Sequence, residues 1–159
     1  MAEYVYNAVQ VVQPNQPVLL RDSIPCNKGY VFHRNESGIL TLRGIVNNAC
    51  GCFARYQVTF NGNIAIPSTG TAPAGISIAL ALDGEPILTS KAIVTPAAVA
   101  AEPPTDENYF NVTSTAIITV PKGCCFNVSV ENTSAPADAA TPAPAINVKN
   151  ANLTVSRIA

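Results

Sequence analysis

The amino-acid sequence predicts an all-β domain of eight to ten short strands, arranged as a sandwich or barrel. Apolar and polar residues alternate strictly over residues 56–61, and over 76–82 Ile and Leu alternate with Ser and Ala. A period of two is typical of half-buried strands, because successive side chains leave opposite faces of the pleat. No segment has a sustained helical period, and turn-forming residues separate the strand-like runs at a spacing typical of sandwiches and barrels.

The central strand is predicted over residues 56–67. One face of its first half is apolar, and the other is polar and uncharged. Cys50 and Cys52 have the parity of the apolar face, so we expect the strand to extend back to them. The apolar face is formed by Tyr56, Val58 and Phe60, and the polar face by Gln57, Thr59 and Asn61.

The remaining strands follow from enrichment in β-branched and aromatic residues between turn signals. Asp83-Gly84 directly follows the alternating run 76–82 and predicts a tight hairpin, because this pair tolerates positive φ. In the run after Gly123, Cys124 shares parity with Phe126 and is expected in the core, with Cys125 outward. These strands are expected over 4–12, 18–20, 30–33, 39–42, 76–82, 87–94, 109–120, 124–130, 146–148 and 153–158.

Length and charge limit the classes of function. We expect a single domain, residues 1–159, because 159 residues suffice for one buried core. Only 12% of the residues are charged, about half the usual share, which favours a surface partly covered by identical neighbours over one merely rich in Ser, Thr, Asn and Ala. A net charge of −1 without a Lys/Arg run predicts no nucleic-acid partner.

The sequence also predicts no membrane partner, since no window has 18 uninterrupted apolar residues. The first residues lack the basic and apolar regions of a signal peptide, so synthesis in a host cytoplasm is expected.

The five cysteines are Cys26, Cys50, Cys52, Cys124 and Cys125. The odd number leaves at least one thiol unpaired within a chain. Cys50-Gly-Cys52 and Cys124-Cys125 are spaced too closely for the pairs of a zinc ribbon. Reduced, buried thiols are the favoured interpretation, and a disulfide between the two clusters or a bound metal are the alternatives.

No constellation of residues predicts catalysis, a cofactor or a metal. His33 is the single histidine, whereas a cupin-type metal site needs two or three with a carboxylate. A Cys–His nucleophile has no recognisable activating context. Asp106 and Glu107 could form a calcium site with Asp138, although their spacing does not require it. The carboxylates that glycoside chemistry would need fall at expected turns or strand ends, where solvated acids are common; they are Asp22, Asp83, Glu85, Asp106, Glu107 and Glu131.

Three motifs resemble one known family. The hairpin Thr115–Val130 resembles the penultimate hairpin of the tumour-necrosis-factor/complement-globular-head jelly roll, and Asn152–Ile158 resembles its last strand. The run Arg55–Phe60 takes the position of its central strand. The resemblance implies a two-sheet antiparallel jelly-roll sandwich of about ten short strands and a tight homotrimer. Within the family, the sequence is similar to bacterial and bacteriophage members: capsid-decorating or head-fibre proteins and C-terminal domains of spore-surface collagen-like proteins.

These observations lead to a first hypothesis: a non-enzymatic, homotrimeric decoration or head-fibre protein on a bacteriophage capsid, located on the virion surface. Gln57, Thr59 and Asn61 are the candidate subunit interface. The N-terminal segment 1–13, with Tyr4 and Tyr6, is the candidate anchor on the major capsid protein or another shell protein. The chain starts at Met1 without a Gly-X-Y stalk, which favours decoration over the spore-surface alternative.

The other alternative is an adhesin-type module that recognises a host glycan or protein through loops 67–75, 95–108 and 133–145. These loops are poor in Trp, Tyr and Arg, the usual anchors of an interface, which disfavours this alternative.

Overall fold

The computed structural model describes residues 1–24, 29–34, 36–48, 50–67, 75–96 and 105–159. Within these ranges the regular structure is β, apart from two short 3-10 turns, and no helix is long or apolar enough to cross a membrane. The 3-10 turns are η1 (Leu88–Ser90) and η2 (Asp106–Asn108). The strands are β1 (Ala2–Tyr6), β2 (Gln10–Val12), β3 (Asp22–Ile24), β4 (Val31–His33), β5 (Leu40–Arg43), β6 (Phe53–Ala65), β7 (Ile76–Leu82), β8 (Glu85–Pro86), β9 (Ala92–Val94), β10 (Phe110–Pro121), β11 (Cys125–Asn132) and β12 (Ile146–Arg157).

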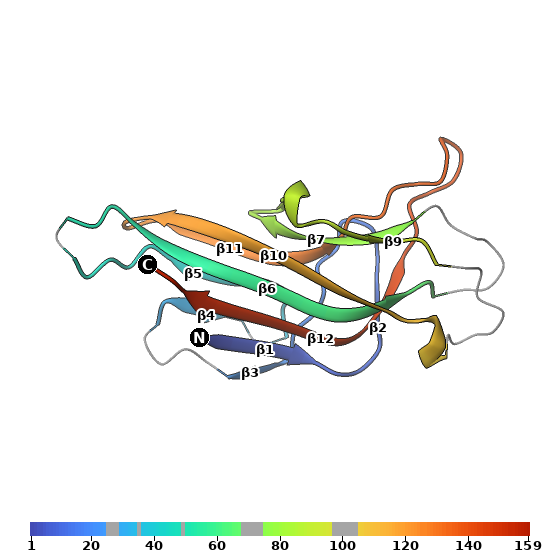
Figure 1. The fold of residues 1–159 in the computed structure, drawn as a ribbon, viewed down its shortest axis with the longest axis horizontal. Coiled ribbons are helices and arrows are strands. Elements are labelled where there is room, and N and C mark those ends of the chain that lie inside the picture. Colours follow the sequence, from blue (N-terminus) through green and yellow to red (C-terminus); the bar gives the residue numbers. More distant parts are fainter. Residues whose placement is uncertain (25–28, 35, 49, 68–74, 97–104) are drawn as a thin grey trace.

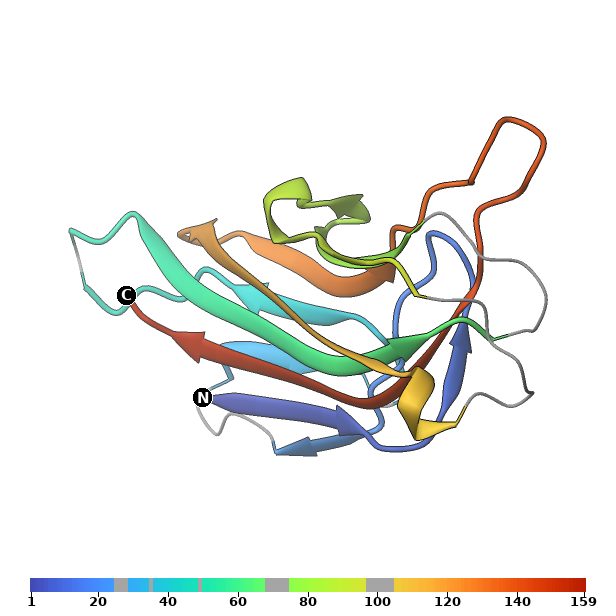
Figure 2. The same ribbon diagram turned by 45° about the vertical axis from the view of Figure 1, so that its right-hand side comes forward.

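The strands form two antiparallel sheets that pack face to face (Figures 1 and 2). The front sheet has the order β10-β6-β12-β1-β3, with β2 also paired to β12. The back sheet has the order β4-β5-β11-β7-β8, with β9 also paired to β7. The chain crosses between the sheets from β5 to β6 and from β10 to β11, in the manner of a jelly roll. The predicted class, an all-β two-sheet jelly-roll sandwich, is confirmed, with twelve strands in the described ranges rather than about ten.

The core lies between the two sheets and is lined by the apolar faces that the alternation predicted. In β6 the residues of even number from Ala54 to Ile64 are buried, and those of odd number between Phe53 and Asn63 are exposed or half-exposed. Tyr56 is fully buried, and its hydroxyl donates a hydrogen bond of 2.5 Å to the Arg43 carbonyl on β5. This bond ties the front sheet to the back sheet and satisfies the polar end of the ring inside the core.

The tight hairpin at Asp83-Gly84 is present. Both residues have positive φ, 50° and 86°, and they join β7 to β8 with Leu82 opposite Glu85. Of the strand expected over 87–94, only β9 at its end forms, because the 3-10 turn η1 occupies Leu88–Ser90. Ser90 in that turn donates to the Ile87 carbonyl and accepts from the Leu80 amide, so side-chain bonds replace part of the ladder there.

Three other expectations near the N-terminus are corrected. The run 4–12 forms two strands, β1 and β2, that both pair with β12. Residues 18–20 are not a strand; one isolated bridge lies just before them at Pro17, and another lies at Leu20. Asp22–Ile24, which carries no alternation signal, is strand β3 because it pairs with β1 at the sheet edge.

Candidate functional site

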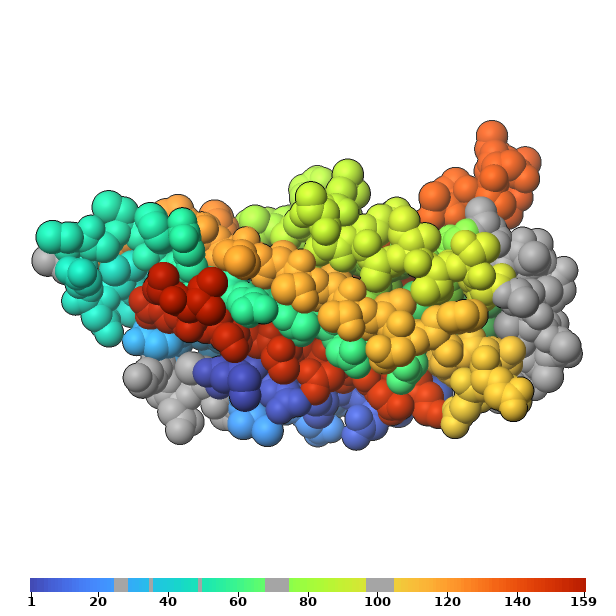
Figure 3. Space-filling model, viewed as in Figure 1, coloured from blue at the N-terminus to red at the C-terminus, as the bar shows by residue number. Residues whose placement is uncertain are grey.

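The centre of the outer face of the front sheet is uncharged on its three most extensively paired strands, β10, β6 and β12, which run side by side across Figure 3. We call the nine side chains at the centre of this surface the neutral face. Each is exposed or half-exposed, and none is ionisable. Row by row across β10, β6 and β12, the neutral face consists of Ile117, Gln57 and Ser156; Thr115, Thr59 and Thr154; and Thr113, Asn61 and Asn152.

Hydrogen bonds between neighbouring strands already engage many polar groups of the neutral face. Thr115 Oγ1 donates to Thr59 Oγ1 over 3.2 Å, and Asn61 Nδ2 donates to Thr113 Oγ1 over 3.0 Å. Asn152 Nδ2 donates over 2.5 Å to Glu3, which lies on β1 at the border of the face. Because these groups have partners within the sheet, covering them with another protein surface costs less desolvation energy than covering unpaired polar groups.

The predicted interface residues Gln57, Thr59 and Asn61 lie together in the middle column of the neutral face, and their role stays a prediction. The sequence did not identify their neighbours on β10 and β12, because these come from runs more than 50 residues away and meet β6 only through strand pairing. The outward positions of residues 113–117 and 152–156 are uncharged in the sequence, and this pattern could have identified the neighbouring residues.

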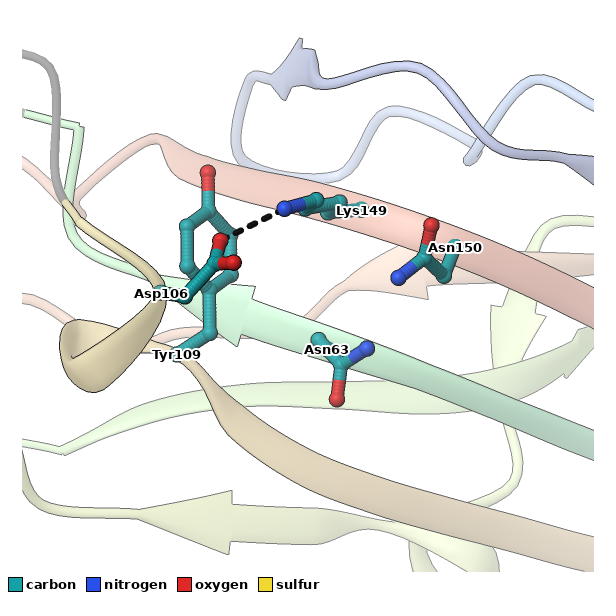
Figure 4. Close-up of a pocket in the computed structure, with 5 residues that line it drawn as sticks. All are labelled: Asn63, Asp106, Tyr109, Lys149 and Asn150. Carbon is teal, nitrogen blue, oxygen red and sulfur yellow. Dashed lines mark hydrogen bonds and ion pairs between the residues drawn. The ribbon is translucent and has the colours of Figure 1, made fainter.

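A small polar pocket of about 200 Å³ lies at one end of the same sheet (Figure 4). Lys149 Nζ forms an ion pair of 2.6 Å with Asp106 and lies 5.7 Å from the centre of the Tyr109 ring. The hydrogen bond to Asp106 raises the pKa of Lys149 above its ordinary value. The pocket is lined by Asn63, Asp106, Tyr109, Lys149 and Asn150.

The backbone at Asn150 explains why this pocket is recessed. Asn150 has a φ of 53°, and the register between β12 and β6 shifts from Lys149 to Asn152. Such a β-bulge bends the strand and redirects the side chains around it, and asparagine tolerates the left-handed conformation. Alternation along residues 146–158 breaks at this position, but the sequence alone did not identify the bulge.

The calcium site considered for Asp106, Glu107 and Asp138 is not assembled. Among the described residues, no group of three or more His, Cys, Asp or Glu side chains is close enough to hold a metal ion. Asp106 is paired with Lys149. Asp138 accepts hydrogen bonds from the amides of Ala140 and Thr141 in its own turn, and bonding to Thr141 lowers its pKa.

His33 is part of the packing at the edge of the back sheet. Its Nε2 atom lies 2.9 Å from the Ser37 carbonyl, and its ring centre lies 4.8 Å from that of Tyr4. The Nδ1 atom is buried without a hydrogen-bond partner in the described part of the chain. These contacts are those of a half-buried structural residue.

The two tyrosines proposed as anchors have different environments. Tyr4 is 1% exposed and belongs to the core, so it offers no surface to a shell protein while β1 is paired. Tyr6 is half-buried, with the Arg21 guanidinium 5.1 Å from its ring centre. Segment 1–13 as a whole supplies β1 and β2 of the front sheet rather than a free arm.

The expectation of buried thiols is wrong for the four cysteines in the described ranges, all of which are exposed. Cys50 and Cys52 precede β6, which begins at Phe53, and Cys124 belongs to the turn before β11 rather than to the core. Cys125 points outward, as expected. Cys26 lies outside the described residues. The two clusters lie at the same end of the sandwich (Figure 1), where the Lys122 amide donates to the Cys52 carbonyl over 2.8 Å.

This exposure predicts that four thiols react rapidly with Ellman's reagent in the native protein, because the reagent can reach each of them without unfolding of the core. The measurement compares the rapid phase under native conditions with the total of five cysteines in denaturant. A rapid phase of fewer than four thiols, with the rest released only on unfolding or on reduction, would contradict the exposed, reduced arrangement.

The fold and the face together define a jelly-roll sandwich domain whose front sheet has an uncharged patch at the centre of its outer face. No family model and no curated protein matches the chain. Among solved structures, the globular domain of zebrafish complement 1qA protein is similar, with a TM-score of 0.49 and 15% sequence identity, covering 96% of this chain and 94% of that chain. A likeness at this identity concerns the fold alone and says nothing of what this chain binds.

Proposed function

We propose that this protein is a non-enzymatic structural protein that forms a homotrimer through the neutral face and decorates a larger particle, namely the capsid of a bacteriophage. The observation that supports self-association is the neutral face itself. Nine adjacent positions on the best-paired strands carry no charge, while charged residues such as Arg55 and Glu3 lie at its borders. Depletion of charge at the centre with polar and charged residues at the rim is typical of protein interfaces.

The character of the face also favours a protein partner over solvent alone. Ile117 is 65% exposed at the edge of the face and offers apolar area, and the threonine row is already hydrogen-bonded between β10 and β6. A trimer rather than a dimer is the assembly implied by the jelly-roll family that the sequence resembles. If the front sheets meet around the threefold axis, the back sheet and the loops at the ends remain outside.

Because Tyr4 is buried, other surfaces must make the contact with the shell protein. Tyr6 is half-buried and accessible, and the loop 133–145 extends from one end of the sandwich (Figure 2). The loops predicted at 67–75 and 95–108 lie largely outside the described residues. We assign the shell contact to the major capsid protein or another shell protein, with the virion surface as the location.

Imaging the source particle tests this function. We expect cryo-electron microscopy of purified virions to show many copies of the jelly roll as threefold-symmetric knobs on the axes of the capsid lattice. Mass spectrometry of the same particles identifies the chain and its copy number relative to the shell protein. Absence from virions together with presence on purified spores would favour the spore-surface alternative, and absence from both would contradict decoration.

The polar pocket favours a second candidate, the adhesin-type module. Two amides, a carboxylate, an ammonium group and one aromatic ring converge there. The polar groups can bind sugar hydroxyls, and the aromatic ring can pack against the face of a sugar ring. Specific hits on a glycan array that are lost when Asn63 or Asn150 becomes alanine, combined with a low copy number at fibre tips, would favour this candidate over decoration.

A further inference from the structure

A second recess, which we call the groove, lies on the outer face of the back sheet, on the opposite side of the sandwich from the neutral face. Its volume is about 320 Å³, at the lower end of the range for small-molecule sites. Alternate residues of β11 are among those that line it, together with the turn between β7 and β8 and two apolar residues. The groove is lined by Pro17, Ile39, Asp83, Gly84, Asn127, Ser129 and Glu131.

The carboxylate of Glu131 is unusual for an outward-facing residue of a sheet. Glu131 is only 7% exposed, and its Oε1 atom accepts a hydrogen bond of 2.7 Å from the Ser129 hydroxyl. Within the described residues it has no ion pair. In the described part of the chain the Ser129 hydroxyl is the one donor to this carboxylate, and it is neutral, so a positively charged ligand would be favoured there.

A second carboxylate, that of Asp83, lies at the other end of the groove. Its Oδ1 atom accepts the Asn127 amide over 2.9 Å. Asn127 and Glu131 are four residues apart on β11, roughly 13 Å along an extended strand, so one small ion would not contact both acids. No Lys or Arg is among the lining residues, and no metal-binding group of three ligands exists among the described residues.

We propose that this groove binds a linear organic polyamine. One terminal ammonium group pairs with Glu131, beside Pro17, and the other is held near Asp83. The chain between them lies over Ile39 and the neutral polar residues Asn127 and Ser129, whose side-chain oxygens can accept from an internal ammonium group. This ligand class matches the observations together: two separated negative charges, uncharged lining residues between them and no competing cation from the protein.

Isothermal titration of the full-length protein with spermidine tests the proposal. We expect saturable binding of one spermidine per chain, with a dissociation constant below about 1 mM. E131Q and D83N should each weaken binding at least tenfold. Both replacements keep a side-chain oxygen that can accept the existing hydrogen bond, and Asn tolerates the positive φ of residue 83, so the fold should persist; circular dichroism checks this. E107Q, which removes the same charge from an exposed turn elsewhere, should leave binding unchanged.

Several results would overturn the proposal. These are the absence of saturable binding, equal binding by wild type and both variants, displacement of spermidine by equimolar Mg²⁺, and binding of butylamine as tight as that of spermidine. The last would show a site for one charge rather than two. The groove and the neutral face lie on opposite sheets, so the outcome of the polyamine experiment does not depend on whether the protein is a trimer.

Discussion

We expect the substitution T59E to convert the homotrimer into monomers. Thr59 is the central residue of the neutral face, with Thr115 and Thr154 beside it on the neighbouring strands. A glutamate there would place one charge per subunit within the proposed interface, and the effective cost of burying an unpaired charge is several kcal/mol. Light scattering coupled to gel filtration should show about 50 kDa for wild type, three copies of the 16.6 kDa chain, and a single chain for T59E at micromolar concentration.

The matched control for this experiment is T41E. Thr41 lies on the outer face of the back sheet with comparable exposure, and it also donates a hydrogen bond across strands, to Asn127 Oδ1 over 2.9 Å. T41E should therefore stay trimeric. A wild-type protein that is monomeric at micromolar concentration would refute the homotrimer. A wild-type dimer that T59E dissociates would retain the neutral face as interface and refute the threefold assembly.

The second large effect is expected for G44A, which should destabilise the fold by about 3 kcal/mol or more, lowering the melting temperature by roughly 10 °C. Gly44 is buried where the β5–β6 and β10–β11 connections cross between the sheets. A Cβ atom at this position would meet the carbonyl oxygen of Pro121 and lie 3.1 Å from that of Cys124. Both are backbone atoms, so the connections must separate, and the Gly44–Cys124 hydrogen bond of 2.8 Å is lost.

Thermal melting followed by circular dichroism measures this loss, with G75A as the control. At Gly75 an added Cβ would lie 3.1 Å from a methyl carbon of Ile93 and 3.2 Å from the carbonyl oxygen of Val94, so its neighbours need to move by only a few tenths of an ångström. We expect G75A to stay within about 1 kcal/mol of wild type. A G44A protein that melts at the wild-type temperature would contradict the close approach of the two connections.

Local patterns in the chain predicted most of the individual strands. The alternation over Tyr56–Asn61 and Ile76–Leu82 correctly assigned both strands, and it assigned the inward face of β6 because side-chain direction depends only on residue parity within an extended segment. Asp83-Gly84 correctly located a hairpin because two consecutive residues of positive φ demand these residue types. Such features are local, and neighbouring residues suffice to specify them.

The errors arose where tertiary contacts override local preference. Cys124 shares the parity of the core face but lies in the turn before β11, and Asp22–Ile24 has no strand signal but is extended by pairing with β1. Tyr4 has the character of an exposed aromatic anchor only if the N-terminal segment is free, whereas pairing with β12 buries it.

By itself, therefore, the sequence determined the fold class, the principal strands and the uncharged character of the Gln57, Thr59 and Asn61 positions. Only the tertiary structure decided that β10 and β12 flank β6 and extend these positions into a neutral face. It also decided that Asp83 and Glu131, 48 positions apart in the sequence, line one groove. The physical reason is that residue type and parity set which way a side chain points, whereas strand register sets which side chains become neighbours, and register depends on the packing of the whole sandwich.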